Sequence, residues 1–190
     1  MGDEAEVARA PLEVRRLVAD ELLVGLGAGG IDHPGGDLLS HLRRTADQLQ
    51  AWGADDDLVL TGLCHAVYGT DGFPVALLGL DQRPRVRDAV GAAAERAIYR
   101  YDACARRTTY SRLGVVPLVL DDRFDGSAIA LTDHEAAGFA TLTIANELDL
   151  VREDAFDTGT VAEIADLFRR LAAYAPEPSR RAVDEIDARG

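Results

Sequence analysis

The chain contains four histidines, and three of them, His33, His41 and His65, fall close together in the sequence. A neutral imidazole binds divalent ions such as Zn, Fe and Mn, and it also takes up and releases protons near neutral pH. We predict that these three side chains form one cluster, with donor atoms suited to a divalent ion such as Zn, Fe or Mn. Their spacing also permits three separate core histidines, each hydrogen-bonded to a carbonyl, and this alternative stays open.

Two helices and a loop are expected to position the three imidazoles. The segment AGGIDHPGG predicts a loop that contains His33. The apolar pattern predicts one helix over 37–53, which carries His41, and another over 57–67, which carries His65. A short connection packs consecutive helices antiparallel, so the two helical histidines should face a shared interior.

Four polar side chains are candidates for a catalytic role beside the histidines. Tyr68 and Asp71 lie on the loop that is expected after His65, and Asp71 belongs to its TDGFP segment. Loops at helix ends often hold polar groups around a pocket. Asp71 is a candidate general base, although a plain turn explains it equally well. Asn146 and Glu147 lie on a later helix, on faces expected to be buried, and either could reach a site built by the histidine helices.

Two further residues are candidates for binding a substrate. Arg107 belongs to a group of arginines that could bind an anionic group, although a solvated charged surface is the ordinary explanation. Trp52 is a neighbour of His41 on the helical wheel, at the edge of the apolar stripe. The sequence contains no HExxH, paired CxxC or GxSxG motif, so no standard zinc-protease, zinc-ribbon or serine-hydrolase site is indicated.

The remaining pattern predicts a mostly helical protein with a short β-hairpin. The hairpin is expected from PLVL and SAIAL, which are separated by DDRFDG. Further helices are predicted over 11–25, 84–104, 132–151 and 160–174. We expect one domain over 1–190, with its core in about 11–175 and a charged tail over 176–190.

The amino-acid composition limits the classes of partner that the protein is expected to bind. Twenty basic and 33 acidic residues give a formal net charge of -13, which disfavours nucleic acid and anionic lipid. The two cysteines form no CxxC pair, and no apolar run approaches the roughly 18 residues of a membrane span. We therefore expect a cytoplasmic protein with a small-molecule substrate and no membrane partner, and we leave a homodimer open.

The motifs HPGGDLLSHL and LTGLCHAVYGTDGF, with LQAWG between them, resemble a poorly characterised family of bacterial and plant helical proteins that is distantly similar to the HD superfamily. The likeness covers about residues 30–151. It implies an HD-like helix bundle, with His41 and His65 at the two histidine positions that bind metal in HD proteins.

The sequence departs from the HD pattern at two ligand positions. Ala66 follows His65 where HD proteins have an aspartate, and Asn146 stands at the position most like their last aspartate. The resemblance therefore implies a single ion, held by the three histidines, rather than a dinuclear site.

The resemblance implies a metal-dependent enzyme that acts on a small molecule and is hydrolase-like. The alternatives are an iron-dependent oxygenase, and a metal-free cyclase, lyase or isomerase of biosynthesis that uses histidine as acid and base. A non-catalytic binding protein on a degenerate HD-like fold is a further alternative.

Overall fold

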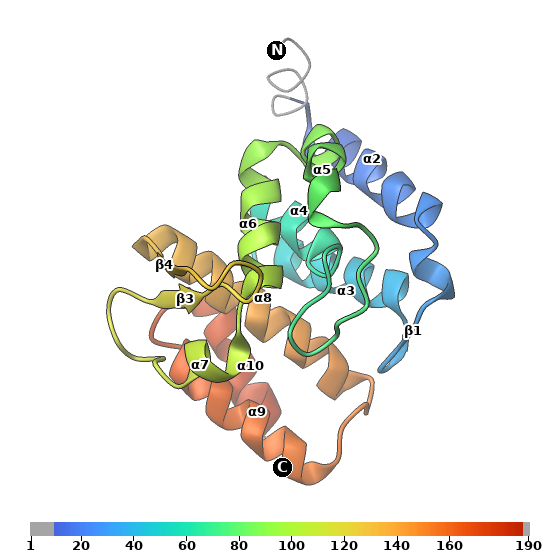
Figure 1. Cartoon of the computed structure of the whole chain (residues 1–190). Helices are drawn as coiled ribbons and strands as arrows, with labels where there is room; N and C mark the ends of the chain where they lie inside the picture. Colours follow the sequence, from blue (N-terminus) through green and yellow to red (C-terminus); the bar gives the residue numbers. More distant parts are fainter. Residues whose placement is uncertain (1–9, 188–190) are drawn as a thin grey trace. The chain divides into compact units, whose positions relative to one another are not determined.

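A computed structural model describes residues 10–187, except for the side chains of residues 183, 185 and 187. The described chain is mostly helical with short strand pairs, which confirms the predicted fold class (Figure 1). It divides into two compact units, Met1–Ala103 and Cys104–Gly190. Within residues 10–187, no helix combines the length and the apolar character that crossing a membrane would need.

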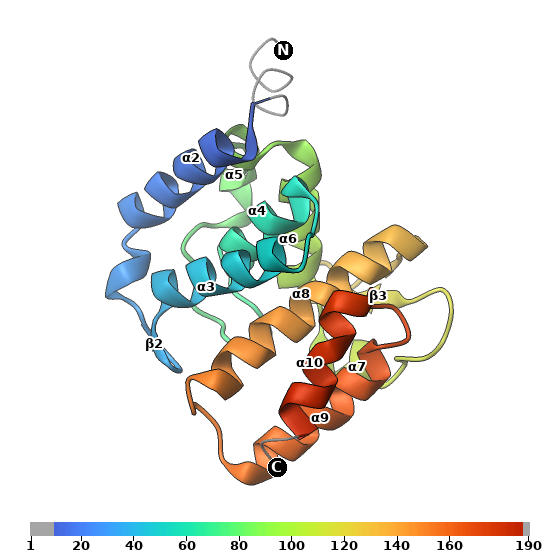
Figure 2. The same cartoon turned by 180° about the vertical axis from the view of Figure 1, so that it is seen from behind.

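The first unit is built around a central helix, α4, that packs against α2, α3 and α6 (Figures 1 and 2). Residues 59–64 of α4 are all buried, as expected for a helix that is apolar on both faces. The elements of this unit are α2 (Leu12–Gly25), β1 (Asp32–His33), β2 (Gly36–Asp37), α3 (Leu38–Ala51), α4 (Asp56–Cys64), α5 (Arg83–Val90) and α6 (Ala92–Ala103), with short 3-10 turns at Ala28–Gly30 and Leu80–Gln82.

The two predicted histidine helices are present and are joined by a short turn. Asp37 caps the start of α3, where its carboxylate accepts the backbone N–H of Ser40 at 3.0 Å. Asp55 caps α4 in the same way, with Leu58 as the donor at 2.8 Å. Gly53, at φ +74°, makes the turn between the helices, so α3 and α4 pack as neighbours.

Two helix predictions were wrong in their bounds. The single helix expected over 84–104 is broken at Gly91, which has φ +87° and separates α5 from α6. The helix expected over 57–67 ends at Cys64. The next turn is tighter, with the Val67 N–H donating to the Cys64 carbonyl at 3.0 Å, and the Tyr68 N–H then donates to the carboxylate of Asp102. Both breaks matter for the site, because they set where α6 meets the end of α4.

The second unit combines a hairpin with three longer helices. The hairpin strands pair antiparallel, with Leu120 opposite Ile129, which confirms the predicted hairpin. Thr132 and Glu135 form the expected capping box at the start of α8. The elements of this unit are α7 (Arg106–Tyr110), β3 (Val119–Asp121), β4 (Ala128–Ala130), α8 (Asp133–Arg152), α9 (Thr158–Leu171) and α10 (Glu177–Asp187).

The segment expected as a charged tail forms a helix, α10, that packs on α8 and α9 (Figure 2). Ser179, Ala182 and Ile186 are buried. These residues recur at intervals of three and four, so they lie on one face of a helix even though most of their neighbours are charged. The core of the second unit therefore extends beyond residue 175.

A candidate histidine site

The structure brings His33, His41 and His65 into contact, as predicted. The Nε2 atoms of His41 and His65 are 3.3 Å apart. The rings of His33 and His41 are stacked, with centroids 4.2 Å apart and 22° between their planes. The three imidazoles thus form one continuous group within the first unit.

His41 and His65 are the buried members of this group, with 1% and 2% of their surfaces exposed. His41 lies in the first half of α3, on the face that also buries Thr45. His65 is the C-cap residue of α4, directly after its last residue, Cys64. Because α3 and α4 are neighbours joined by a short turn, the start of one helix meets the end of the other, and the two rings face each other there.

Hydrogen bonds set the direction of the contact between the two buried rings. The Nδ1 atom of His65 lies 2.7 Å from the carbonyl oxygen of Gly62. A carbonyl oxygen can only accept, so Nδ1 carries the proton, and Nε2 of the neutral ring is an acceptor. His41 therefore donates its Nε2–H to His65. This tautomer is assigned from the hydrogen-bond partners.

His33 is the outermost histidine and is half-buried. It lies on the short β1–β2 hairpin, whose Gly35 and Gly36 have φ values of +81° and +131°. Its Nδ1 is 3.0 Å from the carbonyl oxygen of Pro34. Phe73 packs edge-on against the His33 ring, with centroids 4.8 Å apart, so a loop residue and a hairpin residue together cover this side of His41.

Tyr101 closes the opposite side of the group. Its ring is at 89° to the ring of His65, with centroids 5.5 Å apart. An unbroken line of aromatic rings thus runs from the half-buried loop to the interior of the unit. In order, its members are Phe73, His33, His41, His65 and Tyr101. Sequence reasoning missed both end members, because Phe73 resembled a turn residue and Tyr101 an ordinary core aromatic.

Tyr68, a predicted catalytic residue, is buried just beyond His65 and is fixed at both ends. Its backbone N–H donates to Asp102 at 2.8 Å, and its hydroxyl donates to Glu95 at 3.2 Å. Burial, together with the negative charge of Glu95, raises the pKa of the Tyr68 hydroxyl far above its usual range. Tyr68 is therefore a neutral hydrogen-bond donor in this position.

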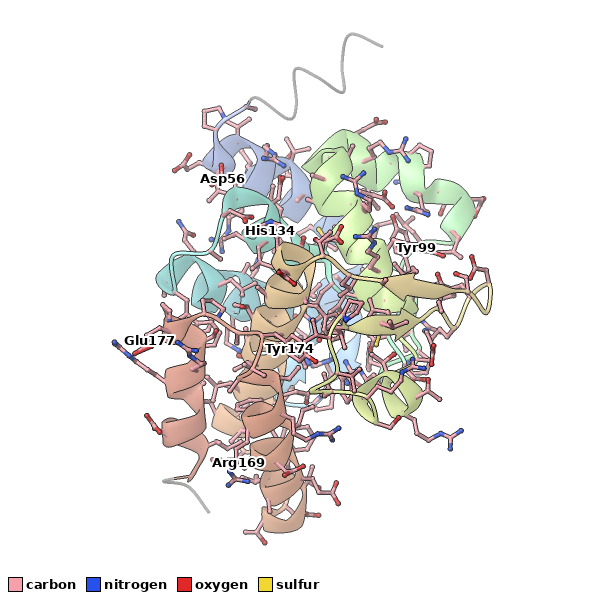
Figure 3. The ribbon with its side chains drawn as sticks, turned by 90° about the vertical axis from the view of Figure 1, so that its left-hand side faces the viewer. Asp56, Tyr99, His134, Arg169, Tyr174 and Glu177 are labelled. Carbon is pink, nitrogen blue, oxygen red and sulfur yellow. The ribbon has the colours of Figure 1, made fainter. Side chains whose placement is uncertain are left out.

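Glu95 is also the partner of Arg83, which binds it through two nitrogens at 2.6 and 3.1 Å. The Arg83 guanidinium lies 3.9 Å from the centre of the Tyr99 ring. Tyr99 and Glu95 both belong to α6, and Figure 3 labels Tyr99 on that helix. The pairing with Arg83 offsets the desolvation cost of the buried Glu95 carboxylate. The sequence analysis did not single out Glu95.

Two predicted residues of the first unit are not buried with the histidine pair. Asp71 is exposed, in a turn closed by hydrogen bonds between Thr70 and Phe73 in both directions. Trp52 is half-buried at the far end of α3 from His41, roughly 16 Å along the helix axis at 1.5 Å per residue. Neighbours on a helical wheel share a face of the helix but can lie far apart along its axis. For this reason Trp52 is not beside the imidazoles.

Three predicted residues belong to the second unit. The side chains of Asn146 and Glu147 are buried, and the amide of Asn146 donates to the Glu147 carboxylate at 3.0 Å. Arg106 donates to the same carboxylate at 3.1 Å. Arg107 is exposed on α7. His134, the histidine outside the predicted cluster, is exposed at the start of α8 (Figure 3).

The donor atoms match only part of a metal site. Two nitrogen ligands of a tetrahedral ion with bonds of about 2.0–2.1 Å lie roughly 3.4 Å apart, close to the 3.3 Å between the His41 and His65 Nε2 atoms. The bond from His65 to Gly62 is the kind of outer contact that orients a metal-binding histidine.

Among the described residues, no third protein ligand joins these two nitrogens. The His33 ring is stacked on His41, and the in-plane lone pairs of stacked rings run side by side and do not converge. Asp37 caps α3, and its hydrogen bonds from Ser40 lower its carboxyl pKa. In the described part of the chain, no group of three or more histidine, cysteine, aspartate or glutamate side chains could hold an ion. The donors present do not make up a complete site, and the three-histidine metal site stays a prediction.

Residues 22–106 match a family model described as a domain of unknown function, DUF6817. This segment lies almost entirely within the first unit and includes all three clustered histidines. It agrees with the predicted likeness to a poorly characterised family, while the resemblance to the HD superfamily stays a prediction. Comparison with curated proteins and with solved structures gives no significant match.

Proposed function

We propose that this protein is an enzyme that moves a proton on a small-molecule substrate, with His41 and His65 as its acid–base pair. The observation that carries the proposal is the 3.3 Å contact between the two Nε2 atoms, with His65 Nδ1 bonded to the Gly62 carbonyl. A cyclase, lyase or isomerase that needs no metal would use such a pair.

The two imidazoles together define where a proton is held. With His65 Nδ1–H donating to Gly62, the neutral pair has one proton between the two Nε2 atoms, and it belongs to His41. Protonation of both rings would make both Nε2 atoms donors and place two positive charges 3.3 Å apart. The contact therefore holds a single proton, the one that exchanges with the substrate.

The surroundings favour a chemical role over simple packing. Buried polar groups cost free energy unless they are paired, and apolar side chains would fill a helix–helix contact without that cost. Here two buried histidines meet each other, and the half-buried His33 and Phe73 separate them from solvent. Excluding water strengthens the electrostatic interactions of a bound substrate with the pair.

A metal-dependent, hydrolase-like enzyme is the second candidate, and the spacing of the two Nε2 atoms favours it. His41 and His65 would hold the ion, with His33 as the predicted third ligand. The ion would polarise a substrate oxygen or activate water. This candidate requires His33 to leave its stacked position, because stacked rings do not direct their lone pairs to one point.

Elemental analysis distinguishes the two candidates. The protein is purified without a chelator, beside His41→Ala and the exposed control His134→Ala. The acid–base proposal predicts less than stoichiometric metal in all three proteins. Stoichiometric Zn, Fe or Mn that is lost only in His41→Ala would overturn it in favour of the metal-dependent enzyme.

Proton transfer itself is tested without knowing the substrate. The purified protein is incubated with a small-molecule extract in deuterium oxide, and mass spectrometry identifies compounds that gain deuterium or change structure. We expect at least one such compound with the wild type and with His134→Ala, and none with His65→Ala. Identical products from the wild type and His65→Ala would contradict the acid–base role and favour a binding protein.

A further inference from the structure

We propose that Asp102 is a positioning residue that holds His65 in its contact with His41. This inference rests on the proposed function, because it concerns how the same histidine pair is kept in place. Asp102 lies on α6, is fully buried, and accepts the backbone N–H of Tyr68 at 2.8 Å.

The hydrogen bond from Tyr68 to Asp102 replaces a bond that a longer helix would make. If α4 continued, the N–H of Tyr68 would bond to the carbonyl of Cys64. In the structure that carbonyl accepts from Val67 at 3.0 Å instead, in a tighter turn, and the helix ends. Asp102 thus fixes the bend that begins at His65, and the bend sets the direction of its ring.

The same helix, α6, holds the histidine and the bend at three points. Tyr101, the neighbour of Asp102, packs edge-on against the His65 ring. Glu95, two turns earlier, accepts the Tyr68 hydroxyl at 3.2 Å. Tyr68 is therefore held to one helix by its backbone through Asp102 and by its side chain through Glu95, which leaves little freedom for the residues between His65 and Tyr68.

A local structural role would look different, as Asp122 of the second unit shows. This buried aspartate accepts the backbone N–H groups of Phe124 and Asp125, at 2.8 and 3.3 Å, within its own turn. Asp102 reaches the backbone of Tyr68, 34 residues away and three residues after His65. Asp122 is accordingly a control: a buried aspartate whose carboxylate accepts backbone N–H groups of its own turn.

The test uses the full chain, labelled with nitrogen-15 histidine in one sample and with nitrogen-15 tyrosine in another, so that the imidazoles and the Tyr68 amide are both observed. With only four histidines, each imidazole is assigned by one substitution. The variants are Asp102→Ala, Asp102→Asn and Asp122→Ala, with circular dichroism to confirm folding. An asparagine oxygen can still accept the Tyr68 N–H, whereas alanine cannot.

In wild-type protein, the His65 nitrogen signals should show a protonated Nδ1 and an unprotonated Nε2. We expect Asp102→Ala to abolish this pattern and to leave the His134 signals unchanged. Asp102→Asn and Asp122→Ala should keep the His65 signals. If Asp102→Ala does not fold, Asp102→Asn decides: a folded variant with altered His65 signals overturns the proposal, and unchanged signals with a shifted Tyr68 amide support it.

The failure of this inference is distinguishable from the failure of the proposed function. Unchanged His65 signals in folded Asp102→Ala would remove Asp102 from the site and leave the histidine pair in place. A wild-type spectrum in which His65 carries its proton on Nε2 would overturn the pair itself, and the positioning role with it.

Discussion

His33 lies flat against His41, with the two ring centroids 4.2 Å apart. His41 is buried and His33 is half-buried, so the outer ring covers one face of the inner ring. Phe73 packs on the edge of His33 and completes the cover from a second loop. Within the first unit, His33 and Phe73 thus form the cover of His41, and single substitutions can expose it.

Removing the His33 ring should make His41 accessible to reagents. We expect His33→Ala to increase the rate at which diethyl pyrocarbonate modifies His41 by about tenfold or more, which corresponds to about 1.4 kcal/mol less protection. His33→Phe keeps a ring in place and should retain the protection. Mass spectrometry of tryptic peptides measures the rates, and the exposed His134 is the internal standard. Equal His41 rates in the wild type and His33→Ala would show that His33 is not a cover.

The close approach of α3 and α4 depends on Gly62. A Cβ atom at this position would overlap with the Leu49 Cδ1 atom, in a fully buried side chain. We expect Gly62→Ala to destabilise the protein by about 1–3 kcal/mol through overpacking. Leu49→Ala alone should cost about 2–5 kcal/mol, and the double variant should cost clearly less than the sum, because the small side chain makes room. Urea unfolding measures each value, and additive costs would contradict this packing.

The Arg83–Glu95 pair should contribute more to stability than an exposed pair. The Glu95 side chain is 2% exposed, so Arg83→Ala would leave a buried carboxylate without its guanidinium, at a cost of about 3 kcal/mol. The control is Arg181→Ala, whose pair with Glu177 is exposed and should contribute less than about 1 kcal/mol. Adding Glu95→Gln to Arg83→Ala should recover part of the loss, because the buried charge is removed. Equal losses for both arginine variants in urea unfolding would contradict the expectation.

The buried Cys64 thiol gives a pH-dependent prediction. Burial raises the pKa of Cys64 from about 9.0 to about 12, and the charge of Asp102 acts in the same direction. The folded pKa lies above the unfolded one, so the thiol does not oppose folding below about pH 9, and stability falls as the pH rises from about 9 to 12. Urea unfolding at several pH values measures the slope, and Cys64→Ala should reduce it.

The same thiol should be unreactive in the folded protein. At about pH 8 a thiol reagent should label neither Cys64 nor the buried Cys104 in buffer, and both in denaturant. Rapid labelling of Cys64 under native conditions would mean that the end of α4 opens readily. The inferred order at His65, the next residue, would then be wrong.

The sequence by itself determined the local elements that carry the site. Three local signals predicted α3 and its neighbour α4: Asp37 at a helix start, a glycine after a helix end, and the periodic spacing of apolar residues. Each of these signals depends only on residues close together in the sequence. The short turn between the helices was enough to predict that His41 and His65 meet. The capping box at Thr132 placed α8 for the same reason.

Only the tertiary structure decided what the histidines contact and how. The direction of the His41–His65 bond depends on the Gly62 carbonyl, which is exposed to His65 because α4 ends there. The turn after that end is held by Asp102, which accepts the N–H of Tyr68 from 34 residues further along the chain. Periodicity assigns a side chain to a face of its own helix, but it does not specify which distant side chain packs against that face, because this depends on how all the helices fill the core together.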